Sequence, residues 1–469
     1  MSSQSTYSFP ALLGKKPLVA DFSGGRLSSD GGLLLLAELD RRLGLTETLA
    51  ETLIDRRDRA KVDLSLLELL RQRVYQIACG YEDADDADHL RRDPLFKSAV
   101  GHAPESGRDL GSQPTFSRFE NAVTRKELRE FAAALVQFFL TQHQAERVVR
   151  IVLDLDATED PTHGQQELNF YNHHYRSHCY LPLLVYATVT VETETGARQE
   201  LPEQELLVAL LRPVNKEAAF RAVAVLRRLV PLLRQRWPGV ELVVRADSGF
   251  ARPELYDWCE AQQVGYCLGL AKNSVLVRRT EPWLADARIA YGAQPEPAPG
   301  AARPAVREFG EYLYQAGSWD RERLVTCKAE VLAQGDNPRW LVSGGLPADL
   351  QEPAARYQFY CLRGDRENRI KEWKCDLRAD KTSCHRFAAN QFRLLLHTAA
   401  YVLWQAARKL LAGTAWATCQ VGTLQLRLVK VAARVRESCR RVYVQLASGC
   451  PWQQLWATFA GRLERLAMP

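Results

Sequence analysis

The sequence of 469 residues has eleven cysteines but no Cys-x2-Cys pair and no regular cysteine spacing. The odd count argues against a disulfide framework, so we expect reduced thiols in a cytoplasmic protein without a structural zinc site. The N-terminus lacks the basic, apolar and small-residue progression of a signal peptide. A Gly-x4-Gly-Lys-Ser/Thr loop is also absent, which disfavours ATP-driven chemistry and a nucleotide cofactor.

Long apolar runs are missing as well. The most apolar segment, residues 394–411, contains His397 and Gln405, and it reaches Arg408 before it attains the roughly 20 apolar residues that span a bilayer. We therefore expect no membrane partner. The composition, 46% hydrophobic and 25% charged, is that of an ordinary globular protein.

Positive charge is concentrated at one end of the chain. The net charge is a modest +6, and residues 421–469, with eight Lys/Arg and two Asp/Glu, carry a surplus equal to that of the whole chain. This local basic surface suggests an anionic partner, although a solvated helix face explains it equally well.

The first part of the chain has the pattern of helices. Thr124 and Glu127 form a Thr-x2-Glu capping box ahead of an amphipathic segment, and Pro114 stands where the preceding helix can begin. Two short helices in succession could be a helix-turn-helix that reads DNA or two members of a bundle. Further along, His173, His174, His178 and Cys179 form a cluster that we interpret as surface or packing residues rather than metal ligands.

The periodicity changes at Arg147, where RVVRIVLDLD forms a nearly continuous apolar run typical of a buried strand. Two more strand-like runs follow, then a helix, a strand, a helix and a strand, which predicts a mixed α/β sheet with helices on both faces. We expect five segments: a helical N-terminal region (1–145), the first part of the core (146–272), a strand-rich insertion (273–345), the second part of the core with a further helix (346–410), and a basic helical C-terminal region (411–469).

Carboxylates end two of the predicted strands. Asp154 and Asp156 lie two residues apart and therefore point to the same face of the sheet, and Asp247 ends the strand ELVVRAD. Ligands of open α/β sheets bind at the carboxyl ends of strands, so these residues predict a shared site. An all-oxygen cage of this kind suits Mg²⁺ or Mn²⁺.

The segment YCLRGDRENRIKEWK carries five side chains that share one face if it is a helix: Tyr360, Arg363, Glu367, Lys371 and Lys374. One interpretation is an exposed ladder of ion pairs worth about 0.3–0.5 kcal/mol each. The other is that Glu367 is a third metal ligand among phosphate-binding groups.

These residues resemble the DDE transposases of bacterial insertion sequences, which have an RNase H-like core. Tyr360, Arg363, Glu367 and Lys374 match the Tyr-x2-Arg-x3-Glu-x6-Lys signature of one branch, and the segments LGSQPTFSRFEN, LDLDAT and RADSGF match in the right order. Over nearly the whole chain the sequence is most similar to the insertion-sequence group numbered thirteen-eighty. The fold implied is an RNase H-like mixed α/β core with a strand-rich insertion, flanked by helical N- and C-terminal regions.

The resemblance implies that Asp156, Asp247 and Glu367 are the catalytic acids and the ligands of two Mg²⁺ ions, for which Mn²⁺ can substitute. Asp156 is preferred to Asp154 because the motif places a Thr two residues after the acid. Asp154 is the runner-up.

At the third acid, Glu372 is an alternative to Glu367 that breaks the signature spacing. Tyr360, Arg363, Lys371 and Lys374 would contact DNA phosphates.

The function implied is that of a cut-and-paste transposase that binds the terminal inverted repeats of its own element through its N-terminal region. It would cleave the DNA by metal-dependent hydrolysis and transesterification and join the 3′-hydroxyl ends to target DNA, as a homodimer on double-stranded DNA. Two rivals are a catalytically inactive DNA-binding protein derived from a transposase and an RNase H-like nuclease without strand transfer.

A DNA hairpin intermediate is also implied, and it would need a protein group that holds an unstacked base. We hypothesise that Trp340 stacks on that base, with Trp319 as the second candidate. The competing interpretation is a core tryptophan, because large aromatic residues on strands usually pack.

Overall fold

The computed structural model describes residues 6–9, 18–297 and 302–466, and the chain divides into two compact units. The terminal unit comprises Met1–Glu127, Cys375–Ala379 and Ala399–Pro469, and the core unit comprises Leu128–Lys374 and Asp380–Thr398. The N- and C-terminal regions thus fold together. Two helices, α7 (Arg125–Gln142) and α13 (Phe387–Leu410), contribute to both units.

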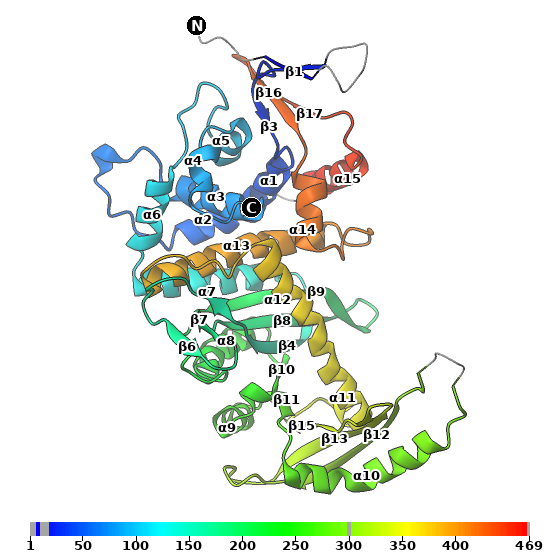
Figure 1. Cartoon of the computed structure of the whole chain (residues 1–469). Coiled ribbons are helices and arrows are strands. Elements are labelled where there is room, and N and C mark those ends of the chain that lie inside the picture. The colour runs from blue at the N-terminus through cyan, green and yellow to red at the C-terminus, as the bar shows by residue number, and fades with distance from the viewer. Residues whose placement is uncertain (1–5, 10–17, 298–301, 467–469) are drawn as a thin grey trace. The chain divides into compact units, whose positions relative to one another are not determined.

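The terminal unit is mainly helical (Figure 1). Its helices are α1 (Leu33–Leu43), α2 (Leu45–Ala50), α3 (Leu66–Ala78), α4 (Asp86–Leu90), α5 (Pro94–Val100), α6 (Gln113–Ala122), α14 (Val421–Leu424) and α15 (Gln453–Glu464). The expected capping box is present, because the Glu127 backbone N–H donates to Thr124 Oγ1 at 3.3 Å and the Thr124 N–H donates to Glu127 Oε2 at 2.9 Å. No helix in the described part of the chain has a stretch long and apolar enough to traverse a bilayer.

Short strands complete the terminal unit: β1 (Tyr7–Phe9), β2 (Leu18–Ala20), β3 (Leu27–Ser28), β16 (Ala433–Glu437) and β17 (Val442–Leu446). The prediction of an all-helical C-terminal region is therefore wrong at residues 433–446, where β16 and β17 form an antiparallel hairpin beside β3 (Figure 1). The physical reason is a period-two pattern. Ala433 and Val435 are buried, whereas Arg434 and Arg436 are exposed.

The core unit is built on one large mixed sheet with the strand order β12-β13-β15-β11-β10-β4-β8-β9, and β14 pairs with β13. Its first strands and helices are β4 (Val148–Ala157), β8 (Leu183–Glu192), β9 (Arg198–Leu210), α8 (Ala222–Arg236), β10 (Glu241–Ala246), α9 (Pro253–Ala261) and β11 (Gly265–Leu270). The expected order of three strands, helix, strand, helix and strand is confirmed. β4, β10 and β11 are parallel, and β8 and β9 are antiparallel, as in an RNase H-like core.

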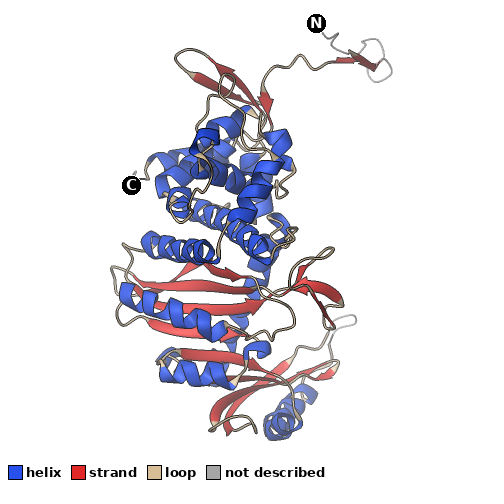
Figure 2. Cartoon of the chain, turned by 90° about the vertical axis from the view of Figure 1, so that its left-hand side faces the viewer, coloured by secondary structure: helices blue, strands red, loops and turns tan. Residues whose placement is uncertain are grey.

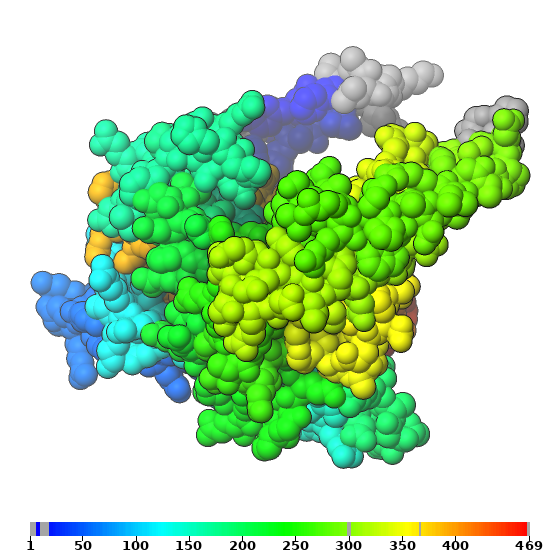
Figure 3. Space-filling model, turned by 90° about the horizontal axis from the view of Figure 1, so that it is seen from below, coloured from blue at the N-terminus to red at the C-terminus, as the bar shows by residue number. Residues whose placement is uncertain are grey.

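The predicted insertion extends the same sheet. It contains α10 (Ser274–Gly292), β12 (Val306–Tyr314), β13 (Arg323–Leu332), β14 (Gly335–Asp336) and β15 (Arg339–Gly344), and β15 pairs with β11. The chain then continues into α11 (Pro353–Cys361) and α12 (Asp365–Lys371), and α11 lies against β12 and β13. Figure 3 shows the insertion and the segment that follows it side by side on one face of the molecule.

A small antiparallel sheet of β5 (Asp160–Pro161), β6 (Phe170–Asn172) and β7 (Ser177–Tyr180) follows β4. Helices lie against the strands of the large sheet and run roughly along them (Figure 2).

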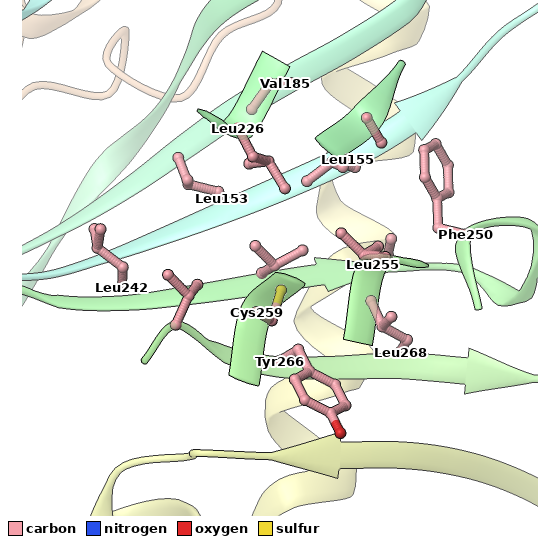
Figure 4. Packing of buried hydrophobic residues seen from close by; sticks show 14 of the residues in the cluster. Leu153, Leu155, Val185, Leu226, Leu242, Phe250, Leu255, Cys259, Tyr266 and Leu268 are labelled. Atoms are coloured by element: carbon pink, nitrogen blue, oxygen red, sulfur yellow. The ribbon is translucent and has the colours of Figure 1, made fainter. Parts of the chain in front are cut away.

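Alternating side chains give the large sheet two buried faces. On one face, Leu153 and Leu155 of β4 pack with Leu226 of α8 and with Leu255 and Cys259 of α9 (Figure 4). The opposite face carries Val152 and Val243, which pack against Phe359 of α11. Asp154, Asp156 and Asp247 belong to this second face by the same alternation, so the fold places the predicted acids on the side of the sheet that α11 covers.

Candidate active site

Asp156 and Asp247 stand at the carboxyl ends of neighbouring parallel strands in the core unit. β10 pairs with β4 in a register that sets Arg245 opposite Asp154 and Ala246 opposite Leu155. Continued by one residue, this register brings Asp247 opposite Asp156, on the same face as Arg245 and Asp154. Asp156 Oδ1 accepts a hydrogen bond of 2.8 Å from the next backbone N–H, and Asp247 Oδ1 accepts one of 2.8 Å from the N–H of Gly249. These bonds orient both carboxylates at the edge where a ligand can approach.

Asp154 has a different environment. It is fully buried, and its two oxygens accept hydrogen bonds from Arg245 Nε at 2.7 Å and Nη2 at 2.9 Å. Arg245 is itself buried, its guanidinium lies 4.6 Å from the ring centre of Phe359, and it also donates to the Phe359 carbonyl. This geometry favours Asp156 over Asp154 as the reactive acid, because both Asp154 oxygens already hold a guanidinium.

Arg363 lies next to the acids. Its Nη1 is 3.4 Å from Asp156 Oδ2, and its side chain is 19% exposed. Burial would lower the pKa of the guanidinium, but Tyr360 and the carboxylates of Asp156, Asp247 and Glu367 together raise this pKa above its ordinary value. One arginine thus experiences all three acids that the resemblance implies, and it remains positively charged at every physiological pH.

The segment that carries Glu367 is not one continuous helix. α11 ends at Cys361, a 3₁₀ turn covers Leu362–Gly364, α12 covers Asp365–Lys371, and a π-helical turn covers Glu372–Asp376. The expected single face is therefore interrupted. Glu367 is exposed on α12, and among the described residues no three His, Cys, Asp or Glu side chains are grouped closely enough to hold a metal ion.

The two lysines of the signature segment have separate environments. Lys371 is exposed at the end of α12. Lys374 is half-buried in the π-helical turn, and its Nζ donates a hydrogen bond of 2.5 Å to the backbone carbonyl of Glu159. Lys374 therefore ties the helical segment to the loop that follows β4.

Tyr360 packs closely on the sheet. A Cβ atom added at Gly269 of β11 would lie 2.6 Å from the Tyr360 hydroxyl and 3.2 Å from the backbone nitrogen of Ser248. Burial raises the pKa of Tyr360, the nearby Arg363 opposes this rise, and Asp247 adds to it. Gly269 thus provides the space that lets the Tyr360 hydroxyl reach the strand end beside Asp247.

Glu372, the alternative third acid, is 2% exposed, and Arg369 Nη1 donates to its Oε2 at 3.2 Å. The same guanidinium lies 3.8 Å from Glu203 through its Nη2. The burial of Glu372 and its ion pair with Arg369, together with the signature spacing, favour Glu367 as the residue open to a ligand.

Both tryptophans considered for base stacking lie in the core of the sheet. Trp340 on β15 is 3% exposed, and its indole N–H donates a hydrogen bond of 2.7 Å to Thr280 Oγ1. Trp319 is 8% exposed, with ring centres 5.3 Å from Tyr256 and 5.4 Å from Tyr314. Their burial favours the packing interpretation that the sequence left open.

The histidine cluster lies on the small sheet. His173, His174 and His178 are exposed and make edge contacts with neighbouring tyrosine rings, whereas Cys179 is buried. This agrees with the surface and packing interpretation of the cluster.

Two residues of the site were missed by sequence reasoning. Arg245 holds Asp154, and the signal was available, because Arg245 precedes Asp247 by the same two residues by which Asp154 precedes Asp156. Tyr175, between β6 and β7, is half-buried near the acids: burial raises its pKa, and Glu159, Cys179, Asp156 and Asp247 raise it further. No spacing in the sequence connects Tyr175 to the acids, since a separate small sheet brings it there.

Comparisons with known proteins supplement this geometry. The model of the family described as "Transposase DDE domain group 1" matches residues 11–468. A comparison with curated proteins found no match. Among solved structures, the chain is similar to one described as a cryo-EM structure of the piggyBac transposase synaptic complex with hairpin DNA. The identity is 11%, the TM-score is 0.40, and the match covers 86% of this chain and 80% of that chain.

Proposed function

The chain belongs to the transposase DDE domain group 1 family, and from this premise we propose that it is a DNA transposase that binds the terminal inverted repeats of its own insertion sequence and cuts there. The observation that supports the proposal most directly is the pair of carboxylates, Asp156 and Asp247, at adjacent strand ends with Arg363 beside them. Carboxylates that share one edge with an arginine can serve a reaction at a phosphodiester.

The donor chemistry fits a hard divalent cation. Asp156 and Asp247 offer carboxylate oxygens, and the buried Asp154 is already bound to Arg245. Because no three such side chains are grouped among the described residues, we propose that Glu367 joins Asp156 and Asp247 when two Mg²⁺ ions, for which Mn²⁺ can substitute, are bound. When bound, such ions supply activation of a water or a DNA 3′-hydroxyl and stabilisation of the departing oxygen.

The chain's own residues orient the DNA. Arg363, 3.4 Å from Asp156 and only 19% exposed, would neutralise the charge of the phosphate that is cut. Tyr360 would donate a hydrogen bond to the same strand, and the exposed Lys371 would contact a neighbouring phosphate. Lys374 would act through its bond to the Glu159 carbonyl, which positions the loop after β4.

Further steps follow from the same premise. We propose that two copies cut the two ends of the element together as a homodimer, that a DNA hairpin is an intermediate, and that the freed 3′-hydroxyl ends are joined to target DNA. The stacking role of Trp340 or Trp319 remains the hypothesis with the least support from the geometry, since both rings are covered in the free protein.

The test is incubation of the full-length protein with labelled DNA from the element's ends, a supercoiled target plasmid and Mg²⁺. Joined products that depend on Asp156 support a transposase. Cutting without joining indicates the RNase H-like nuclease, and binding without cutting indicates the inactive DNA-binding protein. A matched Glu254→Gln variant, which removes an exposed carboxylate from α9 of the same unit, should behave as the wild type.

A further inference from the structure

The hairpin of β16 and β17 in the terminal unit has two chemically different faces. Its register sets Arg434 opposite Gln445 and Arg436 opposite Tyr443, so these four side chains share one face, which we call the outer face. All four are exposed. The intervening residues form the inner face, where Ala433 and Val435 pack with Leu95 of α5, and Leu34, Val444 and Leu446 pack around them.

The charged side chains of the outer face and of the adjoining residues 440–441 are all cationic. Arg434 and Arg436 stand on the strand, and Arg440 and Arg441 stand at the turn. Within the described ranges, none of these four guanidinium groups forms an ion pair with a carboxylate. This cluster supplies half of the Lys/Arg residues in the basic C-terminal segment that was conspicuous in the sequence.

The acidic residue of the hairpin does not neutralise this surface. Glu437 belongs to the inner face, and its Oε2 accepts hydrogen bonds from the backbone N–H groups of Glu105 at 2.8 Å and Ser106 at 3.0 Å. These bonds and the apolar packing of the inner face fix the hairpin to the rest of the terminal unit. The arginines therefore stand on a hairpin that is already ordered before a partner binds. Binding then costs less conformational entropy of the protein.

Two further exposed side chains favour a polyanion that also offers sugars and bases to contact. Tyr443 is 51% exposed, and Leu27 of β3, which pairs with Arg434, is 58% exposed, so both add apolar contact area beside the arginines. Tyrosine and glutamine beside arginines provide hydrogen bonds and contact area for sugars and base edges, whereas the arginines match phosphates.

We propose that the outer face, made of Arg434, Arg436, Tyr443 and Gln445 with Arg440 and Arg441 at its turn, binds double-stranded DNA. The proposal rests on the proposed transposase function and adds a binding surface made of residues of the terminal unit. A two-stranded ribbon fits the major groove of B-form DNA, which is about 12 Å wide. The major groove of A-form RNA is too narrow for side chains to read, so duplex DNA fits this surface better than duplex RNA.

The experiment measures, by fluorescence anisotropy, the affinity of the full-length protein for a fluorescein-labelled DNA duplex of mixed sequence, roughly 40 base pairs long. The salt concentration is varied from roughly 0.05 to 0.3 M, because phosphate contacts make the affinity depend strongly on salt in this range. The test variant is the double substitution Arg434→Gln/Arg436→Gln. The control is Arg227→Gln/Arg228→Gln, which removes two exposed cations from α8 of the core unit, outside both the hairpin and the N-terminal region. Thermal unfolding verifies that both variants are folded.

If both arginines contact phosphates, the test variant should lose about two units of salt slope and about 30-fold in affinity near 0.15 M salt, and the control should match the wild type. A Tyr443→Ala variant should weaken binding with an unchanged salt slope. Equal losses in the test and control variants would overturn the proposal, as would a loss confined to single-stranded RNA or to an acidic polypeptide used in place of the duplex.

Measurements of DNA affinity and of DNA cleavage distinguish a failure of this inference from a failure of the proposed function. If the hairpin does not bind DNA, the test variant keeps wild-type affinity while Asp156→Asn abolishes cutting. If the chain is not a transposase, the wild-type protein fails to cut and join the element ends whatever the hairpin does. Cutting at saturating protein should persist in the Arg434→Gln/Arg436→Gln variant, because its acids are intact.

Discussion

Arg245 binds Asp154 through two hydrogen bonds of 2.7 and 2.9 Å across adjacent parallel strands, and both side chains are buried. The next pair of positions along the same register, Asp247 and Asp156, carries two carboxylates instead. The two pairs of residues have different electrostatic consequences. A carboxylate with its own guanidinium is a structural ion pair, whereas two neighbouring carboxylates repel each other unless a cation lies between them.

We predict that Asp154→Asn destabilises the fold more than it impairs the chemistry. The substitution leaves the buried Arg245 without its counter-charge, and losing one partner of such a pair costs about 3 kcal/mol. The free energy of unfolding from denaturant titration measures this loss. At a temperature where the variant is folded, it should retain DNA cleavage, and complete loss of cleavage in the folded variant would return Asp154 to the set of reactive acids.

The succession of strands and helices along the core and the positions of Asp156 and Asp247 at strand ends were predictable from the sequence, because buried parallel strands have a strong apolar signature and their ends carry ligands. The choice between Asp154 and Asp156 was not settled by residues alone. It depends on the register of β10 against β4, which pairs Arg245 with Asp154, and a shift of two residues would have reversed the roles.

We predict that Asp156→Asn, Asp247→Asn and Glu367→Gln each reduce Mg²⁺-dependent cleavage to background and leave binding to the element ends nearly unchanged. Each substitution removes a negative charge needed to hold a cation but retains the size of the side chain. Gel assays for cleavage and anisotropy for binding separate the two effects. The exposed Glu254→Gln substitution is the control, and near-normal cleavage by any one of the three variants would exclude that residue from the site.

We predict an acid-sensitive contact in the terminal unit. Burial alone would raise the pKa of Glu127, but hydrogen bonds from Arg56, Thr124 and the backbone of Ile54 lower it to about 2. Since the ordinary value is 4.5, the folded state binds the proton more weakly than the unfolded state. The stabilising contribution of Glu127 is therefore present above pH 4.5 and is lost as the pH falls toward 2.

The Arg56→Gln variant tests this linkage. The Arg56 side chain is 47% exposed, so we expect the variant to be less stable than the wild type by up to about 1 kcal/mol at pH 7. The difference should vanish near the pKa of about 2. Urea titrations at several pH values measure it, and a difference that is independent of pH would contradict the role assigned to Glu127.

Residues 360–374 show why part of the site could not be predicted. The spacing assumes about 100° per residue throughout, but the 3₁₀ turn at Leu362–Gly364 and the π-helical turn at Glu372–Asp376 change that angle. Lys374 is half-buried and donates to the Glu159 carbonyl, whereas Lys371 is exposed. Departures from a regular helix of this kind depend on tertiary contacts, and the sequence pattern does not reveal them.

We predict that Trp340 contributes chiefly to stability. Replacing a buried tryptophan by alanine leaves a cavity and costs about 3 to 5 kcal/mol. Trp340→Phe is the informative variant. Apart from the cost of the smaller side chain, loss of the indole hydrogen bond should lower the free energy of unfolding by only about 1 kcal/mol, because Thr280 retains its own bond to the Leu276 carbonyl. Normal hairpin formation by a folded Trp340→Phe protein fits the packing role, and nicked DNA that accumulates without hairpins would support base stacking instead.

Gly269 is the position where the sheet allows Tyr360 to approach, and a double-mutant cycle can test this. An added Cβ would lie 2.6 Å from the Tyr360 hydroxyl but 3.4 Å from the ring carbon that bears it. The ring is rigid, so Gly269→Ala must displace Tyr360 away from the strand end beside Asp247. We expect a loss of stability of about 1 to 3 kcal/mol from this overpacking and a large drop in cleavage.

The second substitution is Tyr360→Phe, which removes the hydroxyl and leaves the added methyl group 3.4 Å from the ring, while its 3.2 Å approach to the Ser248 backbone nitrogen remains. The double variant should therefore be more stable than Gly269→Ala alone, and its cleavage rate should approach that of Tyr360→Phe, because the ring returns to its place and only the contact with Ser248 is left to be relieved. Denaturant titration and initial rates of DNA cleavage measure the two couplings. Strict additivity of both quantities would show that the hydroxyl does not occupy the space above Gly269, and the proposed contact between Tyr360 and the DNA strand would lose its structural basis.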